Sequence, residues 1–291
     1  MRGRFFWLLV VWTGLTVAGQ SAAWGYRNSD PSRKNKVAFE LYRDYLIVVR
    51  GSADTVKGLN FLLDTGASPT VLDPRVARKL HLEVTATDIA ILNGNVQGGR
   101  STVPSLELGS LRRDNLPVLI EDLSFLQQAL PAQIDGIVGL DVLGQSAFVV
   151  DYASREIRFG PTPSMPFSIP LQIRDGLAIV KATVNHATVH LLLDTGAPSL
   201  IVFEETPGPQ VYSNGSPRAT SKTIGASERK QVRLNSFTLG DKDFGHQPAF
   251  VIPNYRDAGH DFDGLMSPAA LGITRVAIDL SRGTLAFALE Q

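Results

Sequence analysis

The 291-residue sequence contains no cysteine, and its 28 Lys and Arg residues balance 28 Asp and Glu residues. Without cysteine, neither a disulfide nor a lipoprotein anchor is available. Exported chains often use disulfides, so their absence favours a bacterial envelope protein whose core is large enough to be stable alone. A balanced charge creates no long-range field toward polyanions, and we therefore expect no nucleic-acid partner and no binding to an anionic membrane surface.

The N-terminus resembles an export signal in its order of residue types. Arg2 and Arg4 are followed by the apolar run Phe5–Val17 and then by Ser21-Ala22-Ala23. The alternative, a membrane anchor, needs about 20 apolar residues, which is more than this run supplies. We expect residues 1–23 to be a cleaved signal peptide and the protein to be exported, periplasmic or secreted. Residues 24–36 are polar and predict a flexible leader, with its use as an inhibitory pro-segment left open.

One short phrase occurs twice. Residues 61–68 read Phe-Leu-Leu-Asp-Thr-Gly-Ala-Ser, and residues 191–199 read Leu-Leu-Leu-Asp-Thr-Gly-Ala-Pro-Ser. In both copies an apolar run that predicts a strand is followed by an acid, a hydroxyl-bearing residue and a glycine, in the same order. The two acids are Asp64 and Asp194. Two such phrases in equivalent places suggest two carboxylates brought together on a pseudo-twofold axis.

Other landmarks keep the same spacing from each acid. Asp64 precedes Gly109 by 45 residues, and Asp194 precedes Gly240 by 46. The distances to the later Asp-Gly pairs are 71 residues to Asp135 and 69 to Asp263. This register predicts an internal duplication of one β unit of about 125 residues, which suits a domain. We predict an N-terminal lobe at 37–160, a proline-rich linker at 161–166 and a C-terminal lobe at 167–291.

Local signals predict an all-β fold with short helices. The runs 45–49 and 59–63 predict a hairpin whose turn is Gly51–Asp54, and Asp73-Pro74 predicts an N-cap and first residue of a helix. Asn-Gly between apolar residues predicts a second hairpin over Ile91–Gly99. This hairpin is the candidate for a flap over bound substrate, and Thr223–Ser227 is its candidate in the second half. The candidate substrate-binding residues in the first flap are Asn93, Gly94, Gly98 and Gly99.

Paired acids have a defined chemistry. Two carboxylates held close share a proton, because burial and like charge oppose ionisation of both. The ionised acid takes a proton from water while the protonated acid donates to a carbonyl, so an amide bond is cleaved without metal or cofactor. Gly66 and Gly196 would let the loops turn and approach each other. Thr65 and Thr195 have hydroxyls that could brace the two loops against one another.

These motifs resemble clan AA aspartic proteases. The Asp-Thr-Gly-Ala form and the segment Asp135–Leu140 are similar to the retropepsin-like bacterial aspartyl protease family, and two copies in one chain resemble the bilobal pepsin arrangement. The resemblance covers residues 37–291 and implies two β-barrel lobes, one catalytic acid per lobe, a flap, and an apolar-apolar-Gly segment beneath each acid loop. It implies that Asp64 and Asp194 are catalytic, that Thr65 and Thr195 brace the loops, and that 137–139 is a packing segment.

The sequence departs from that family at three places. The second packing segment ends in Ser267 instead of glycine, which affects the approach to the Asp194 loop. Ala67 and Ala197 stand where pepsins have serine, which implies higher pKa values for the acids than in pepsin and work at mildly acidic to neutral pH. Neither flap candidate contains the tyrosine of pepsin flaps, so substrate would be gated by backbone contacts.

Several alternatives stand beside the protease. Asp135 and Asp263 are also matched acids, but before strands they are interpreted as structural. The group His260–Asp263 suggests a metal, but with no other histidine nearby we interpret it as a solvated loop and expect no metal site. The prediction is an aspartic endopeptidase acting on peptides or proteins, a monomer because one chain completes the site. The alternative is a catalytically silent peptide-binding or structural envelope protein on the same fold.

Overall fold

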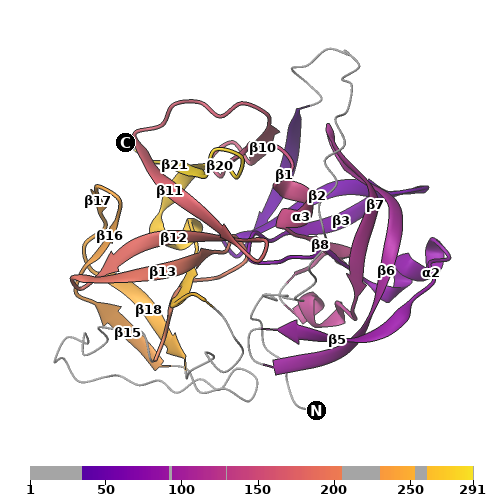
Figure 1. Ribbon diagram of the computed structural model, residues 1–291. Helices are drawn as coiled ribbons and strands as arrows, with labels where there is room; N and C mark the ends of the chain where they lie inside the picture. Colours follow the sequence, from indigo (N-terminus) through magenta and orange to yellow (C-terminus); the bar gives the residue numbers. More distant parts are fainter. Residues whose placement is uncertain (1–34, 92–93, 129, 205–229, 253–260, 291) are drawn as a thin grey trace.

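The computed structural model describes residues 35–91, 94–128, 130–204, 230–252 and 261–290 (Figure 1). Strands make up 58% of the structure, and there are only two short α-helices in this part of the chain. The all-β expectation is therefore confirmed. Within these described residues, no helix is long and apolar enough to cross a membrane.

The described part of the first half contains ten strands and three short helical segments. The strands are β1 (Lys36–Tyr42), β2 (Leu46–Ala53), β3 (Val56–Leu63), β4 (Val71–Leu72), β5 (Thr85–Ile91), β6 (Gly94–Leu108), β7 (Leu111–Ile120), β8 (Gly136–Val138), β9 (Phe148–Asp151) and β10 (Glu156–Phe159). The helical segments are α2 (Pro74–Lys79), the 3-10 helix η1 (Ser124–Gln128) and α3 (Leu140–Leu143).

The described part of the second half contains eleven strands and one 3-10 helix. The strands are β11 (Phe167–Arg174), β12 (Leu177–Val184), β13 (Ala187–Leu193), β14 (Leu200–Phe203), β15 (Lys230–Leu234), β16 (Phe237–Leu239), β17 (Lys242–Asp243), β18 (Gln247–Ile252), β19 (Gly264–Met266), β20 (Ile273–Asp279) and β21 (Thr284–Leu289). The 3-10 helix is η3 (Ala269–Leu271).

The strands around the two acids pair in the same way in both halves. β3 is parallel to β8, and β13 is parallel to β19. A short strand then returns against each partner, β4 antiparallel to β8 and β14 antiparallel to β19. These short strands are also parallel to β7 and β18 respectively. The duplication predicted from residue spacing is thus matched by equivalent sheet topology, while the predicted residue boundaries of lobes and linker stay predictions.

A central sheet joins the halves. β9 pairs with β20 in antiparallel register, Val150 opposite Val276, and the sheet runs β1-β10-β9-β20-β21-β11. Three strands come from each half, in mirrored order. Figure 1 shows the indigo-to-magenta first half beside the salmon-to-yellow second half, with this sheet between them. One hydrophobic cluster also contains residues of both halves, among them Phe148 and Phe287, so the core continues across the junction.

The first hairpin differs from its predicted form. β2 continues through Ala53, and the turn lies at Asp54-Thr55 rather than at Gly51–Asp54. The register shifts between Gly51 and Ser52, which is a β-bulge. A Cβ on Gly51 would lie 2.6 Å from the Glu107 carbonyl oxygen of β6. The glycine therefore marks a close approach of two strands, which resembles a turn signal in the sequence alone.

The helix predicted after Asp73 is present as α2. The Asp73 carboxylate accepts a hydrogen bond from Arg75 N–H at 2.9 Å, and Pro74 is the first helical residue. Val76 and Ala77 of this helix are buried. Capping by an acid and a proline with preset φ explains why six residues suffice for this helix.

Candidate active site

Each acid stands at the point where a central strand ends. Asp64 follows β3, and its N–H donates to the Val138 carbonyl at 3.0 Å; Asp194 follows β13, and its N–H donates to the Met266 carbonyl at 2.9 Å. Asp64 is 0% exposed and Asp194 1% exposed. We call residues 64–67 the Asp64 loop and residues 194–197 the Asp194 loop. The sheet thus extends by one hydrogen bond into each loop and fixes where each acid begins.

The two loops are braced against each other by their threonines. Thr65 N–H donates to Thr195 Oγ1 at 3.1 Å, and Thr195 N–H donates to Thr65 Oγ1 at 3.0 Å. Each hydroxyl then donates to the carbonyl before the opposite acid, Thr65 to Leu193 at 2.7 Å and Thr195 to Leu63 at 3.3 Å. All four bonds are buried. Residues 130 apart in sequence are thereby held in one rigid unit.

We expect the Thr65→Val substitution to loosen this unit. Valine keeps the shape but leaves the Thr195 N–H and the Leu193 carbonyl without a partner, which costs about 1–3 kcal/mol of unfolding free energy for a buried group. Thr195→Val should cost less, because its bond to Leu63 is longer. Thr65→Ser retains the hydroxyl and is the control. Equal urea midpoints for Thr65→Val and Thr65→Ser would contradict the brace.

The carboxyl groups lie close together because glycine stands between them. A Cβ on Gly66 would be 2.8 Å from Asp194 Cγ, and 3.1 and 3.2 Å from its two oxygens. Gly66 N–H donates to Asp64 Oδ1 at 2.8 Å, and Gly196 N–H donates to Asp194 Oδ1 at 2.7 Å. Asp64 Oδ2 is buried and receives no hydrogen bond from any donor in the described residues. Its neighbour is the other carboxyl, so a bond between them requires a proton on one of the two.

The electrostatics favour one proton shared by the pair, and Asp64 is the acid with the more strongly raised pKa. Burial, followed by the charge of Asp194, raises the pKa of Asp64 well above its ordinary value. Burial also raises the pKa of Asp194, to about 6, and hydrogen bonds from Asp64 and from the Gly196 and Ala197 N–H groups partly oppose it. Near neutral pH one carboxyl is therefore protonated and the other ionised. Such a pair combines a proton donor with a proton acceptor.

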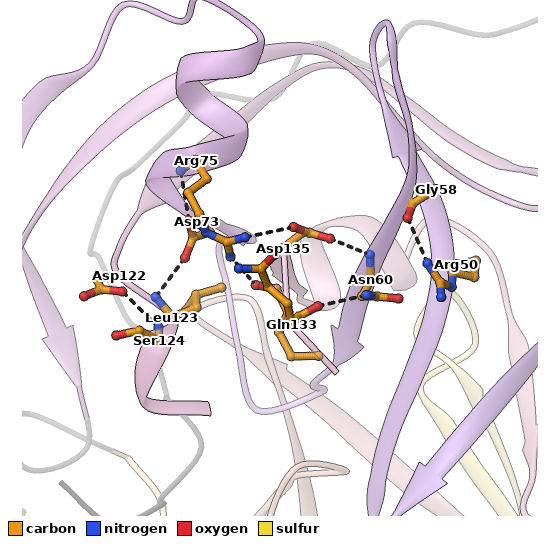
Figure 2. A network of polar contacts seen from close by, with 11 residues as sticks. Arg50, Gly58, Asn60, Asp73, Arg75, Asp122, Leu123, Ser124, Gln133 and Asp135 are labelled. Carbon is orange, nitrogen blue, oxygen red and sulfur yellow. Dashed lines mark hydrogen bonds and ion pairs between the residues drawn. The ribbon is translucent and has the colours of Figure 1, made fainter. Parts of the chain in front are cut away.

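The other two matched acids hold the acid-bearing strands. Asp135 Oδ2 accepts from Asn60 N–H at 2.9 Å, and Asp263 Oδ2 accepts from His190 N–H at 2.8 Å. Asn60 and His190 each lie four residues before an acid. Figure 2 shows Asp135 between Asn60 and Arg75, the guanidinium of which lies 3.6 Å away. This geometry agrees with the structural interpretation of both acids.

A polar network beside the Asp64 loop was not predicted from the sequence. The Asp73 carboxylate, which caps α2, also accepts from Leu123 N–H at 3.2 Å, and Arg75 donates to the Ile134 carbonyl at 3.0 Å (Figure 2). These bonds tie the helix to the residue before η1 and to the segment before β8. The sequence showed only the local cap, because the partners lie 50 and 59 residues away.

Thr70 and Asp141 form a second unpredicted support under the Asp64 loop. The Thr70 hydroxyl donates to Asp141 Oδ1 at 2.7 Å and accepts from Gly139 N–H at 3.1 Å, while Thr70 N–H donates to Asp141 Oδ2 at 3.0 Å. Burial raises the pKa of Asp141. Six residues after the acid, the second half has Leu200 where the first has Thr70. The supports of the two loops therefore differ.

The flap candidates are only partly described. β5 and β6 form the expected hairpin, with Ile91 opposite Gly94, so Gly94 lies in the strand rather than in the turn. Asn93 and the second candidate, Thr223–Ser227, lie outside the described residues. A Cβ on Gly98 would be 2.7 Å from the Ile120 carbonyl, and one on Gly99 would be 2.3 Å from Val84 Cγ1. These two glycines permit close packing, and neither of these neighbours is a catalytic candidate.

A groove of about 1380 Å³ is lined in part by the residues that follow the Asp64 loop in the sequence, but neither Asp64 nor Asp194 lines it. Ser68 and Pro69, which follow the loop, form part of its wall. The turn at Asp175-Gly176 contributes from the second half, and a Cβ on Gly176 would be 3.0 Å from Ser68 Oγ. The groove is therefore built by both halves beside one acid loop.

The described part of the chain contains no group of three or more His, Cys, Asp or Glu side chains that could hold a metal ion. His260 itself lies outside the described residues.

The fold is mostly β and is consistent with an aspartic protease-like fold. In agreement, residues 49–142 match the family model described as "Aspartyl protease". The match covers the Asp64 loop, the β5–β6 hairpin and β8, and supports protease chemistry in general. It extends over about a third of the chain. No curated protein matches the sequence.

Proposed function

We propose that the protein is a single-chain, two-lobed aspartic endopeptidase that uses Asp64 and Asp194 as its catalytic pair. The observation that carries the proposal is the buried, threonine-braced approach of these two carboxyls. If the two acids had only a structural role, bringing two buried carboxyls together without a counter-ion would destabilise the fold and give nothing in return. A shared proton makes that arrangement useful when water must be activated.

The charge states assign a role to each acid. Ionised Asp194 accepts a proton from a water molecule between the carboxyls, while Asp64 donates its proton to the scissile carbonyl oxygen. The resulting gem-diol then loses the amine, to which Asp194 passes the proton it accepted. Asp64 recovers a proton from a diol hydroxyl as the new carboxylic acid forms. The pair returns to its starting state, and neither acid forms a covalent bond to substrate.

The adjoining groove supports a polypeptide as substrate. Its volume exceeds what a single side chain fills, and Ser68-Pro69 connects it to the catalytic loop. Binding energy from residues remote from the scissile bond can be used to orient that bond. The predicted export, the monomeric state and the roles of the flap residues stay predictions.

Activity should depend on pH in the way that the acid pair dictates. Because the pKa of Asp194 is about 6, cleavage should rise as pH increases through that value and the base becomes ionised. It should fall at higher pH, where Asp64 loses its proton. We therefore expect kcat/KM on a quenched fluorogenic peptide to have its acid limb near pH 6, with a maximum close to neutrality. A maximum in strong acid, where both carboxyls are protonated, would contradict the assigned charge states.

A catalytically silent peptide-binding protein is the second candidate, favoured by the altered support under Asp194, where Ser267 replaces glycine. A statine-type inhibitor distinguishes the two functions. Tight binding with no peptide turnover at any pH from about 3 to 8 would favour the silent module. Turnover that the same inhibitor blocks stoichiometrically would favour the endopeptidase.

A further inference from the structure

The layer beneath the two acid loops differs in one pair of residues. β8 pairs Val138 with Leu63, and β19 pairs Met266 with Leu193. The residues that follow are Gly139-Leu140 in the first half and Ser267-Pro268 in the second. These two pairs occupy equivalent positions, but Leu140 has a backbone N–H that can donate a hydrogen bond and Pro268 does not.

In the first half, a backbone N–H supports the end of the loop. Leu140 N–H donates to the Ala67 carbonyl at 2.9 Å, and a Cβ on Gly139 would lie 2.3 Å from that same oxygen. The loop therefore rests directly on the glycine backbone. The end of the Asp64 loop is fixed by this hydrogen bond.

The second half cannot repeat this arrangement. Pro268 has no N–H to donate, and Ser267 carries a Cβ where the other half has none. Ala197, the equivalent of Ala67, is 2% exposed, and no backbone donor in the described residues is hydrogen-bonded to its carbonyl. Ser267 is 0% exposed, and its hydroxyl has no partner among the described residues. A buried acceptor and a buried donor without partners thus belong to the same layer, and a buried polar group that stays unpaired is destabilising.

We propose that Ser267 is a positioning residue for Asp194, its hydroxyl donating to the Ala197 carbonyl in place of the Leu140 N–H of the other half. The inference rests on the proposed function, because the position of Asp194 matters most for catalysis. Rotation about the single Cα–Cβ bond moves the hydroxyl among three staggered positions without moving the backbone. The hydroxyl of Ser267 compensates for the N–H that Pro268 lacks.

The loop geometry connects this contact to the acid. Ala197 N–H donates to the Asp194 carbonyl at 3.4 Å, longer than the 3.2 Å bond from Ala67 to Asp64. The Gly196 and Ala197 N–H groups lower the pKa of Asp194, so a loop that is free to shift would lose part of that effect. Among the described residues, the titratable groups that interact with Asp194 are Asp64, Tyr45 and Tyr152. Burial is the largest cause of the raised pKa of each tyrosine, and the charge of Asp194 raises it further. At Tyr45 the charge of Arg43 lowers the pKa and partly opposes this shift.

The test compares Ser267→Ala with a double variant, Ser267→Gly with Pro268→Leu, which gives the second half the sequence of the first. For Ser267→Ala we expect a kcat about tenfold lower, because one buried hydrogen bond is lost, and a KM that is little changed. The acid limb of the pH profile should shift to higher pH. The double variant supplies a backbone N–H and should recover most of the kcat. Ser146→Ala, which removes a partly buried serine hydroxyl elsewhere, is the control and should leave kcat and the pH limb unchanged.

If Ser267 only fills space in the packing, the opposite results are expected. Ser267→Ala would then raise Tm, because an unpaired hydroxyl is removed, and would leave kcat and the pH profile at wild-type values; that result would overturn the proposal. If wild-type protein shows no turnover, the endopeptidase fails, but the positioning role is still measurable. A ¹³C NMR titration of the Asp194 carboxyl should show a higher pKa in Ser267→Ala than in wild type, and identical titrations would overturn it. Should the double variant fail to fold, the Ser267→Ala comparison decides alone.

Discussion

Asp64→Asn and Asp194→Asn should each abolish peptide cleavage while leaving the fold intact. An asparagine in place of Asp194 could not accept the proton of water, and an asparagine in place of Asp64 could not donate an acidic proton to the scissile carbonyl. Because positioned acid–base groups each contribute about 10²–10⁴-fold, we expect kcat to fall by at least about 10² in either variant. Initial rates on a fluorogenic peptide, with circular dichroism of the same samples, measure both properties.

Asp135→Asn is the matched control for these substitutions. Asp135 is also a buried acid in a matched position, but its carboxylate accepts from Asn60 N–H and has a counter-ion in Arg75, which also pairs with Asp73. We expect Asp135→Asn to lower the unfolding free energy by about 1–3 kcal/mol and to leave the kcat of the folded protein unchanged. Cleavage that survives in Asp64→Asn or Asp194→Asn would dismiss the catalytic pair.

The same variants have a readout that does not require activity. The folded pKa of Asp194 is raised, so its contribution to stability is complete below the unfolded pKa of 3.8 and is lost as pH rises through about 6. Wild-type unfolding free energy should therefore decline across this window, by an amount on the order of 3 kcal/mol, since one pKa unit corresponds to about 1.4 kcal/mol. In Asp194→Asn the part of the decline that belongs to Asp194 should be absent, while Asp64, the pKa of which is also raised by burial, should still contribute.

Gly66→Ala should be nearly as severe as loss of an acid, although it removes no functional group. Its Cβ would lie 2.8 Å from Asp194 Cγ, a separation that real contacts do not tolerate, so the carboxyls must move apart. Misplacement of reacting groups by about 1 Å costs roughly 10²-fold in rate, and we expect at least that loss in kcat. The variant should also lose the part of the raised pKa of Asp64 that depends on the charge of Asp194.

Gly58→Ala separates this steric effect from backbone strain. Gly58 has φ +70° and nothing within 4 Å of its Cβ position, so alanine there meets strain but no clash. We expect a stability loss of about 1 kcal/mol and unchanged kcat. If Gly66→Ala were to cleave at the wild-type rate, the close approach of the two carboxyls would not be what catalysis needs.

The sequence by itself determined the all-β class, the duplicated order of strands and the pair of acid loops. The reason is that these depend on local patterns: an apolar run before Asp-Thr-Gly, an acid-proline cap before α2, an Asn-Gly hairpin. Local patterns fail where glycine serves a distant strand. Gly51 looked like part of a turn because its constraint comes from Glu107, which no neighbouring residue reveals.

Only the tertiary structure decided how the acids are supported. The sequence suggested that Thr65 and Thr195 brace the loops, and the structure supplies the hydrogen bonds, in which each N–H donates to the hydroxyl of the other residue. Asp73 joins segments 50 residues apart, and that contact could not be inferred from spacing. The sequence showed that Ser267 replaces a glycine, but not that its hydroxyl is buried without a partner in the described residues, beside a proline that cannot donate. Composition and order establish which groups are available; the free energy of leaving a buried polar atom unpaired depends on packing, and packing exists only once the chain has folded.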